Sequence, residues 1–225
     1  MSEEIDLVFF DMDHTLLALD ADNSWKYFLV DEGLAPAEDR AKADQYLHLY
    51  HLGLCPLDEF VRFQLREFCG RTPTEMSALA QRHFNERVQP FIYAEAVQVI
   101  RDCAARGIPT LLLTGTNRVI AEPLVMSLGI SSLLATDPEI VNGQFTGGIT
   151  GPFLSKKYKL QKAKESCDNL NSSLNKAAFY ADSINDLQLL EKVGFPTVVN
   201  PSEKLRVVAE ARHWPIKSWS RSVDP

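Results

Sequence analysis

The sequence has few of the features that mark secreted, membrane-bound or metal-clamped proteins. Its 225 residues include four cysteines, which are widely spaced and form no CxxC pair, so neither a disulfide framework nor a zinc site is predicted. No hydrophobic run approaches the length of a transmembrane helix. The acidic N-terminus continues directly into a hydrophobic segment, which is not typical of a signal peptide. These absences predict a cytoplasmic protein with no membrane partner.

The sequence also lacks an excess of positive charge. It has 23 Lys and Arg residues against 30 Asp and Glu, a formal net charge of −7, which argues against nucleic acid as a partner. With 45% hydrophobic and 24% charged residues, the composition is that of an ordinary globular protein. Its length allows one large domain, or a core domain with a smaller inserted one. The oligomeric state cannot be predicted from these features.

One short stretch combines strong hydrophobicity with acidic residues. Leu7–Phe10 are bulky and apolar without alternation, which is typical of a central parallel strand buried on both faces. Asp11 and Asp13 follow at once. Carboxylates at the end of such a strand lie where open α/β sheets bind ligands, and they need a partner or a metal ion if buried.

An alternation of strands and helices resumes from residue 91. Further buried strands are predicted at 108–114, 177–181 and 195–199, with amphipathic helices between them. Asn142-Gly143 predicts a β-hairpin within 139–149. The expected fold class is therefore α/β, with a Rossmann-like parallel sheet as its core.

Residues 18–90 show a different pattern, without any strand signal. Helices are predicted from the caps at 20–24, from near Pro36 to Gly53, from Pro56 to Gly70, and from Thr72, where Glu75 completes a capping box. We therefore expect an all-helical cap domain at 18–90, inserted into a core domain formed by 1–17 and 91–225.

Polar groups follow three of the expected strands. They are Asp11 and Asp13, then Thr114 and Gly115, then Asp182 and Asp186, and the carboxyl ends of parallel strands meet at one edge of a sheet. A lysine from the segment 156–164 can reach the same edge. Clustered carboxylates without His or Cys favour a hard divalent cation, most often Mg²⁺.

Such a cluster suits the transfer of a phosphoryl group. A cation, a lysine and a hydroxyl together neutralise phosphoryl oxygens and position an attacking group in line. A carboxylate beside the metal can be that group and form an aspartyl-phosphate, while the acid two residues further on protonates the leaving oxygen and later activates water.

These residues resemble the haloacid dehalogenase-like (HAD) phosphatases. The family's DxDx(T/V) motif matches Asp11 to Thr15, its strand ending in Thr or Ser matches 111–115, and its (G/S)DxxxD motif matches 181–186 with Ala181 at the first position. The lone lysine of the family is best matched by Lys159, although Lys156 and Lys157 also fit. The helical segment is similar to the cap of subfamily IB, the phosphoserine-phosphatase-like branch, and the motifs are closer still to bacterial members assigned as histidinol-phosphate phosphatases.

The resemblance implies a role for each matched residue. Asp11 would be the nucleophile and Asp13 the general acid and base. Mg²⁺ would be held by Asp11, the main-chain carbonyl of Asp13 and Asp182, with Asp186 supporting its waters. Thr114, Gly115 and Lys159 would bind the phosphoryl group, and Asp20 and Asn185 would contact the substrate.

Several alternatives stay open at the level of sequence. Asp20 is equally well explained as the N-cap of the first helix of the insert. Cap arginines such as Arg62, Arg66 and Arg71 either contact a substrate anion or lie on the surface. The substrate is a small phosphomonoester, with histidinol phosphate and phosphoserine as amino-bearing examples. A phosphoryl transferase or mutase shares the first step, and an inactive binding module is the alternative of another class.

Overall fold

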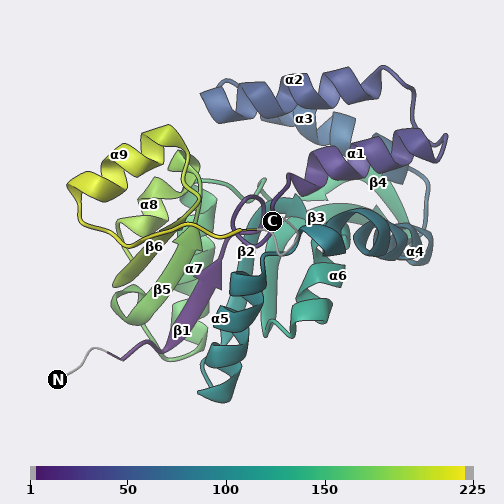
Figure 1. Ribbon diagram of the computed structural model, residues 1–225. Helices are drawn as coiled ribbons and strands as arrows, with labels where there is room; N and C mark the ends of the chain where they lie inside the picture. The colour runs from purple at the N-terminus through teal and green to yellow at the C-terminus, as the bar shows by residue number, and fades with distance from the viewer. Residues whose placement is uncertain (1–3, 221–225) are drawn as a thin grey trace.

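The computed structural model describes residues 4–220, in which one mixed sheet forms the centre of the molecule (Figure 1). Seven strands are hydrogen-bonded in the order β4-β3-β2-β1-β5-β6-β7, and all neighbours are parallel except β3 and β4. The strands are β1 Leu7–Phe10, β2 Thr110–Asn117, β3 Ser132–Val141, β4 Gln144–Thr150, β5 Ala177–Ala181, β6 Phe195–Val199 and β7 Ile216–Lys217. The predicted α/β class with a largely parallel core is confirmed.

Strand β1 lies at the centre of this sheet, between β2 and β5. Its last residue, Phe10, is level with Leu112 of β2 and Tyr180 of β5, so the three strands approach the same edge. Val8 and Phe10 pack on one face with helices α5 (Ala94–Ala105) and α6 (Arg118–Leu128). Leu7 and Phe9 pack on the other face. Burial of both faces is why β1 is apolar at every position.

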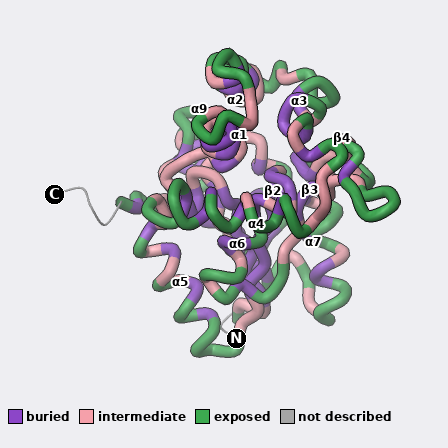
Figure 2. Tube along the Cα trace, turned by 90° about the vertical axis from the view of Figure 1, so that its right-hand side faces the viewer, coloured by how far each residue is buried: buried purple, intermediate pink, exposed green. Residues whose placement is uncertain are grey.

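The opposite face of the sheet is covered by the C-terminal helices. These are α7 Lys157–Asn169, α8 Leu187–Leu190 and α9 Glu203–Ala211, whose apolar residues join Leu7 and Phe9 in one cluster. Figure 2 shows the buried residues concentrated in the central strands and the exposed residues along the outer turns of the helices. The edge of the sheet that carries the acids is left for the helical insert to cover.

Between β1 and α5 the described chain is built from helices and turns. The helices are α1 Ala21–Asp31, α2 Asp39–Leu52, α3 Leu57–Gln64 and α4 Pro73–His83, followed by a π-helical turn at Phe84–Val88. The chain enters and leaves this helical insert side by side, because Ala18 N–H donates to Phe91 O at 2.8 Å and Tyr93 N–H to Leu16 O at 3.0 Å. We propose the division into 18–90 and the remainder at these paired segments.

The helical insert packs in two parts. Residues of α1 and α4, including Trp25 and Met76, belong to the same hydrophobic cluster as α5 and α6. Helices α2 and α3 instead share a small cluster of Ala43, Tyr46, Phe60 and Phe63. Figure 1 shows α2 and α3 at the top of the molecule.

Some element boundaries differ from the sequence-based expectation. Helix α2 begins at Asp39 rather than near Pro36, because the chain first makes a turn in which Asp39 N–H donates to Pro36 O. Helix α3 ends at Gln64 and is followed by a 3₁₀ turn at Arg66–Phe68, so it does not continue to Gly70. The hairpin at Asn142-Gly143 and the capping box of Thr72 and Glu75 are present as predicted. No helix within residues 4–220 is long and apolar enough to cross a membrane.

A close backbone approach next to β6 gives a test of the fold. A Cβ atom on Gly194 would lie 1.8 Å from the carbonyl oxygen of Asn175. We therefore expect Gly194→Ala to lower the free energy of unfolding by about 3 kcal/mol, because the backbone of two packed segments must separate. Gly148→Ala, where the nearest atom is a side-chain oxygen at 3.4 Å, should change it by less than about 1 kcal/mol. Equal urea denaturation midpoints for the two variants would contradict the packing described here.

Candidate functional site

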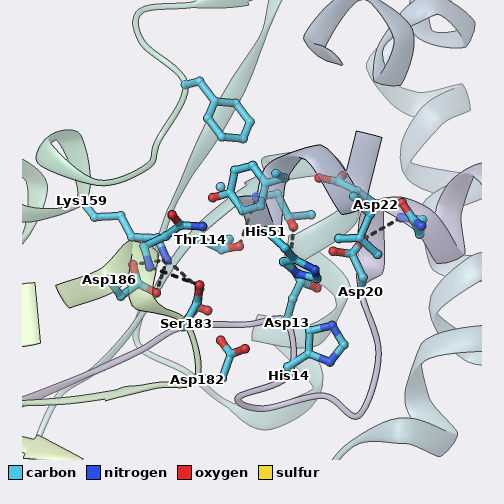
Figure 3. Close-up of a pocket in the computed structure, with 18 of the residues that line it drawn as sticks. Asp13, His14, Asp20, Asp22, His51, Thr114, Lys159, Asp182, Ser183 and Asp186 are labelled. Atoms are coloured by element: carbon cyan, nitrogen blue, oxygen red, sulfur yellow. Dashed lines mark hydrogen bonds and ion pairs between the residues drawn. The ribbon is translucent and has the colours of Figure 1, made fainter. Parts of the chain in front are cut away.

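A cavity lies between the carboxyl edge of the sheet and the helical insert (Figure 3). Its volume of about 70 Å³ corresponds to roughly five water molecules, enough for a phosphoryl group and a few more atoms. All nine residues predicted from the sequence line it, although they come from β1, α1, β2, α7 and β5. They are Asp11, Asp13, Asp20, Thr114, Gly115, Lys159, Asp182, Asn185 and Asp186.

Lys159 holds two of the carboxylates together. Its Nζ lies 2.8 Å from Asp11 Oδ1 and 2.9 Å from Asp186 Oδ1, and all three side chains are buried. Burial by itself would lower the pKa of Lys159, but the charges of Asp11 and Asp186 outweigh it and raise that pKa. The ammonium is therefore fixed in its charged form at the centre of the acids. Lys156 and Lys157, the alternatives left open by the sequence, are exposed.

Asp13 is oriented by one hydrogen bond to each carboxylate oxygen. Ala21 N–H donates to Oδ1 at 2.7 Å, and the Thr116 hydroxyl donates to Oδ2 at 2.8 Å. Burial, followed by the charges of Asp20 and Asp11, raises the pKa of Asp13 to about 7. A carboxyl group with such a pKa can both give and take a proton near neutral pH.

Asp182 and Asp186 add further negative charge beside Asp11. Burial raises the pKa of Asp186 to about 6 in spite of Lys159, and burial with the charges of Asp11 and Asp186 raises the pKa of Asp182 well above its ordinary value. In the described chain, the Asp182 carboxylate receives no hydrogen bond and forms no ion pair. Figure 3 shows it pointing into open space below Lys159 and Asp186. One lysine thus faces more carboxylates than it can neutralise.

This excess of carboxylates fits a hard divalent cation. Asp11 and Asp182 carry carboxylate oxygens, the kind of ligand that Mg²⁺ prefers, and Mg²⁺ commonly uses only one or two carboxylates and keeps several waters. No group of three or more His, Cys, Asp or Glu side chains within residues 4–220 is arranged to hold a metal ion alone. A cation at this site would therefore also use main-chain and water oxygens, of which the Asp13 carbonyl is the predicted one.

Thr114 and Gly115 form the β2 side of the cavity. Strand β2 runs to Asn117 with an irregular register against β3. Thr114, predicted as the last residue of the strand, and Gly115, predicted to follow it, therefore both lie inside β2. The Thr114 hydroxyl oxygen accepts a hydrogen bond from Thr116 N–H at 3.1 Å, which leaves its own proton available. A Cβ atom on Gly115 would lie 3.1 Å from the ring of Phe153. Glycine there lets Phe153 approach β2.

The insert contributes an acidic wall at the N-terminus of α1. Asp20 is the N-cap, accepting from Asn23 N–H at 2.8 Å, which confirms one interpretation of this residue. It also lines the cavity, and its contact with a substrate stays a prediction. Burial and the charge of Asp11 raise the pKa of Asp20 to about 6, against hydrogen bonds that lower it. Asp22 lines the cavity as well, and burial with the charges of Asp20 and Asp13 raises its pKa well above its ordinary value.

Sequence reasoning missed several residues of this wall. Asp22 could have been found, because it lies in the first turn of a helix whose N-cap already pointed to the cavity. The aromatic residues could not, because Phe153 and Phe60 meet only in the folded chain, with ring centroids 6.0 Å apart. The remaining missed lining residues are His14, Asn23, Leu47, Tyr50, His51, Thr116 and Ser183.

The cap arginines take no part in the site. Arg66 instead forms ion pairs with Asp39 and Glu67 inside the insert. Neither Arg62 nor Arg71 lines the cavity. Among the described lining residues Lys159 is thus the sole Lys or Arg side chain.

A family model for haloacid dehalogenase-like hydrolases matches residues 8–191, which include every residue of the site. The chain belongs to this family. Its curated relatives include a histidinol-phosphatase of Neisseria meningitidis, 29% identical over 93% of this chain and 97% of that protein. The family and its phosphatase relatives identify a HAD phosphatase, that is, a phosphoric monoester hydrolase, as the sequence motifs predicted.

Solved structures agree with this membership. A Bordetella pertussis protein described as of unknown function is 34% identical, with a TM-score of 0.87 over 95% of this chain and 98% of that one. A substrate-bound phosphoserine phosphatase is 15% identical, with a TM-score of 0.71 over 97% of this chain and 94% of that one. The second comparison shows that this chain has the same fold as phosphoserine phosphatase.

The raised pKa of Asp20 predicts how stability depends on pH in protein freed of divalent cations. The folded chain binds this proton up to about pH 6 and the unfolded chain only to the ordinary value of 3.8, so wild-type stability falls as the pH rises between them. Asp20→Asn keeps an N-cap acceptor and removes the titration. The free energy of unfolding of Asp20→Asn minus that of wild type should therefore increase by about 1 to 2 kcal/mol between pH 4 and pH 7. A difference that stays constant across this range in urea titrations would be evidence against a buried, crowded carboxyl.

Proposed function

We propose that this HAD phosphatase is a Mg²⁺-dependent phosphomonoester hydrolase that works through an aspartyl-phosphate on Asp11. The observation that carries the proposal is the ion pair of Lys159 with Asp11 and Asp186, within a cavity that Asp13 and Thr114 also line. The cluster presents a nucleophilic carboxylate, a proton donor and positive charge for phosphoryl oxygens. These are the parts that phosphoryl transfer needs.

In the first step a carboxylate oxygen of Asp11 attacks phosphorus. The bond from phosphorus to the substrate oxygen breaks, and protonated Asp13 gives that oxygen its proton, so the products are an alcohol and phospho-Asp11. The raised pKa of Asp13 supports this role. Lys159, the Thr114 hydroxyl and the Gly115 N–H are the proposed contacts of the phosphoryl oxygens.

In the second step water attacks the phosphorus of phospho-Asp11. Asp13, now ionised, takes a proton from the water, the bond between phosphorus and the Asp11 oxygen breaks, and inorganic phosphate leaves. Asp11, Asp182 and the Asp13 carbonyl would hold Mg²⁺, with Asp186 supporting its waters. When bound, the cation supplies charge that compensates both the carboxylates and the phosphoryl group.

Two alternatives share part of this scheme. A phosphoryl transferase or mutase would use the same first step and replace water by a second substrate; the family name of hydrolase favours water. A catalytically inactive binding module would not need Asp13 held by Thr116 and Ala21 in a fixed orientation. The complete set of acids therefore supports an active hydrolase.

The charge of the insert wall favours an amino-bearing substrate without a carboxylate. Asp20 and Asp22 can neutralise an ammonium group near the reacting phosphate, whereas the one lysine found along the described lining is already shared by Asp11 and Asp186. A substrate carboxylate would lack a cationic partner and face like charge. Of the two amino-bearing examples, this supports histidinol phosphate over phosphoserine, and the relative from Neisseria meningitidis is named a histidinol-phosphatase.

Removing the nucleophile tests the mechanism. Asp11→Asn should lower phosphate release from p-nitrophenyl phosphate by at least about 10³-fold, since a neutral amide cannot attack phosphorus. EDTA should abolish wild-type activity, and Mg²⁺ should restore it. The exposed Asp168→Asn serves as the matched control and should keep full activity. Persistent activity in Asp11→Asn, or indifference to EDTA, would refute the mechanism.

A comparison of two substrates tests the argument from charge. We expect kcat/KM for L-histidinol phosphate to exceed that for O-phosphoserine by at least about tenfold, because one uncompensated carboxylate costs more than 1.4 kcal/mol. Asp22→Asn should narrow this difference, since it removes one repelling charge. A wild-type enzyme that prefers O-phosphoserine would show that the acidic wall does not select against carboxylates.

A further inference from the structure

The last residue of α3, Gln64, has a buried amide without a partner. Its exposed fraction is 4%, and neither Oε1 nor Nε2 makes a hydrogen bond to the described residues. A primary amide can donate two hydrogen bonds and accept two, and leaving such a group buried and unpaired is costly. The methionine side chain has a similar length without that cost. We therefore expect a group outside the described residues, such as a bound ligand, to form hydrogen bonds with the amide.

Gln64 lines a second cavity that adjoins the first. Both cavities are lined by Asp22, Phe60, Gly115 and Phe153, so the second begins directly beyond the acidic wall and the proposed phosphate contacts. Its volume of about 20 Å³ is enough for one or two waters or for the end of a small substrate. The T-shaped pair of Phe60 and Phe153 stands at the boundary of the two.

Two other polar side chains of the second cavity already accept hydrogen bonds from the main chain. Asn117 caps α6 by accepting from Ile120 N–H at 3.3 Å. The Thr136 hydroxyl donates to Gly115 O at 2.7 Å and accepts from Leu154 N–H at 3.0 Å. Gln64 differs from both, because within this described lining it is the side chain whose amide oxygen and nitrogen are both buried without a hydrogen bond. The rest of the wall is apolar: Phe60, Val61, Leu65, Ile149 and Phe153.

We infer that Gln64 is a specificity-determining residue, whose amide hydrogen-bonds an uncharged polar group at the far end of the leaving group. This rests on the proposed function, because it places the phosphoryl group beside Asp11 and the remainder of the substrate across Phe60 and Phe153. The amide matches a group that donates and accepts, such as the nitrogens of a neutral imidazole. No Lys or Arg lines the second cavity within the described chain, so a carboxylate there would be unpaired.

A substrate that satisfies both cavities has a defined chemistry. It is a phosphomonoester of an amino alcohol whose ammonium lies near Asp20 and Asp22 and whose side chain is a flat ring with polar nitrogens. The edge of the ring enters the second cavity between its apolar walls, and Gln64 hydrogen-bonds a ring nitrogen. A ring of the same shape without nitrogens would leave the amide unpaired. Loss of such a buried hydrogen bond discriminates strongly between analogues.

The test compares two substrates that differ only in the ring. L-histidinol phosphate carries an imidazole, and L-phenylalaninol phosphate carries a phenyl group at the same position. We expect wild type to prefer the imidazole substrate in kcat/KM, and Gln64→Met to reduce this preference by about tenfold or more, chiefly through KM. Gln98→Met, at an exposed glutamine of α5 that bonds only Asp102, is the matched control and should leave the preference unchanged.

Each remaining outcome counts for or against the inference. An unchanged preference in Gln64→Met, or equal use of the two substrates by wild type, would overturn it. An unchanged preference together with a lower melting temperature of Gln64→Met would indicate that the amide binds an ordered water and not the substrate. Activity of wild type on p-nitrophenyl phosphate with Mg²⁺ distinguishes failure of the proposed function from failure of the role of Gln64. Absence of this activity would refute the proposed function. Activity together with an unaltered substrate preference in Gln64→Met would refute only the role of Gln64.

Discussion

The site depends on one buried cation among carboxylates. Lys159 contacts Asp11 and Asp186 at hydrogen-bond distance in the interior of the protein, where unpaired charges are strongly destabilising. With Asp13 and Asp182 in the same cavity, negative charge remains in excess. Burial, followed by the neighbouring carboxylates, raises the pKa values of Asp13 and Asp182, and burial raises that of Asp186 in spite of Lys159. A divalent cation bound at the site would compensate part of this negative charge, and protonation of Asp13 would reduce it.

The fold brings these groups together from distant parts of the chain. Asp11 and Asp13 follow the central strand, Asp182 and Asp186 follow its neighbour β5, and Lys159 lies on the helix that packs behind them. The insert is anchored to the sheet as well, because Gly70 N–H donates to Phe145 O and Phe145 N–H donates to Arg71 O, each at 2.9 Å. Helices α2 and α3 share a small aromatic cluster that Phe153 contacts, and α1 joins them because Lys26 Nζ donates to Phe63 O at 2.8 Å and Asn23 Nδ2 to Asp44 Oδ1 at 3.2 Å.

Much of this arrangement could be predicted from sequence, for a physical reason. A hydrophobic run that ends in acids fixes both a buried strand and the location of its polar end, so Asp11, Asp13, Asp182 and Asp186 were predictable neighbours. The lysine of the site could also be predicted, because Lys159 shares the buried face of α7 with Ala163 and Ser166 at helical spacing. Lys156 and Lys157 do not lie on that face.

The specificity wall could not be predicted in the same way. Phe153 follows β4 in a loop, and Phe60 and Gln64 lie on a helix whose apolar pattern indicates only that it packs against something. Whether these three residues come into contact depends on how the insert packs on the sheet, including the space that Gly115 leaves for Phe153. The motifs in the chain thus specify the chemistry, and the packing of the insert on the sheet specifies which substrate groups reach it.

The central claim is that Asp11 carries the phosphoryl group during turnover. The most direct measurement mixes enzyme, Mg²⁺ and p-nitrophenyl phosphate, quenches the mixture in acid within the first turnover, and maps the modified peptide by mass spectrometry. The account predicts that the peptide containing residues 7–17 gains one phosphoryl group, localised to Asp11, and loses it as free phosphate appears. Phosphate release with no modified residue, or with the group on a different side chain, would contradict it.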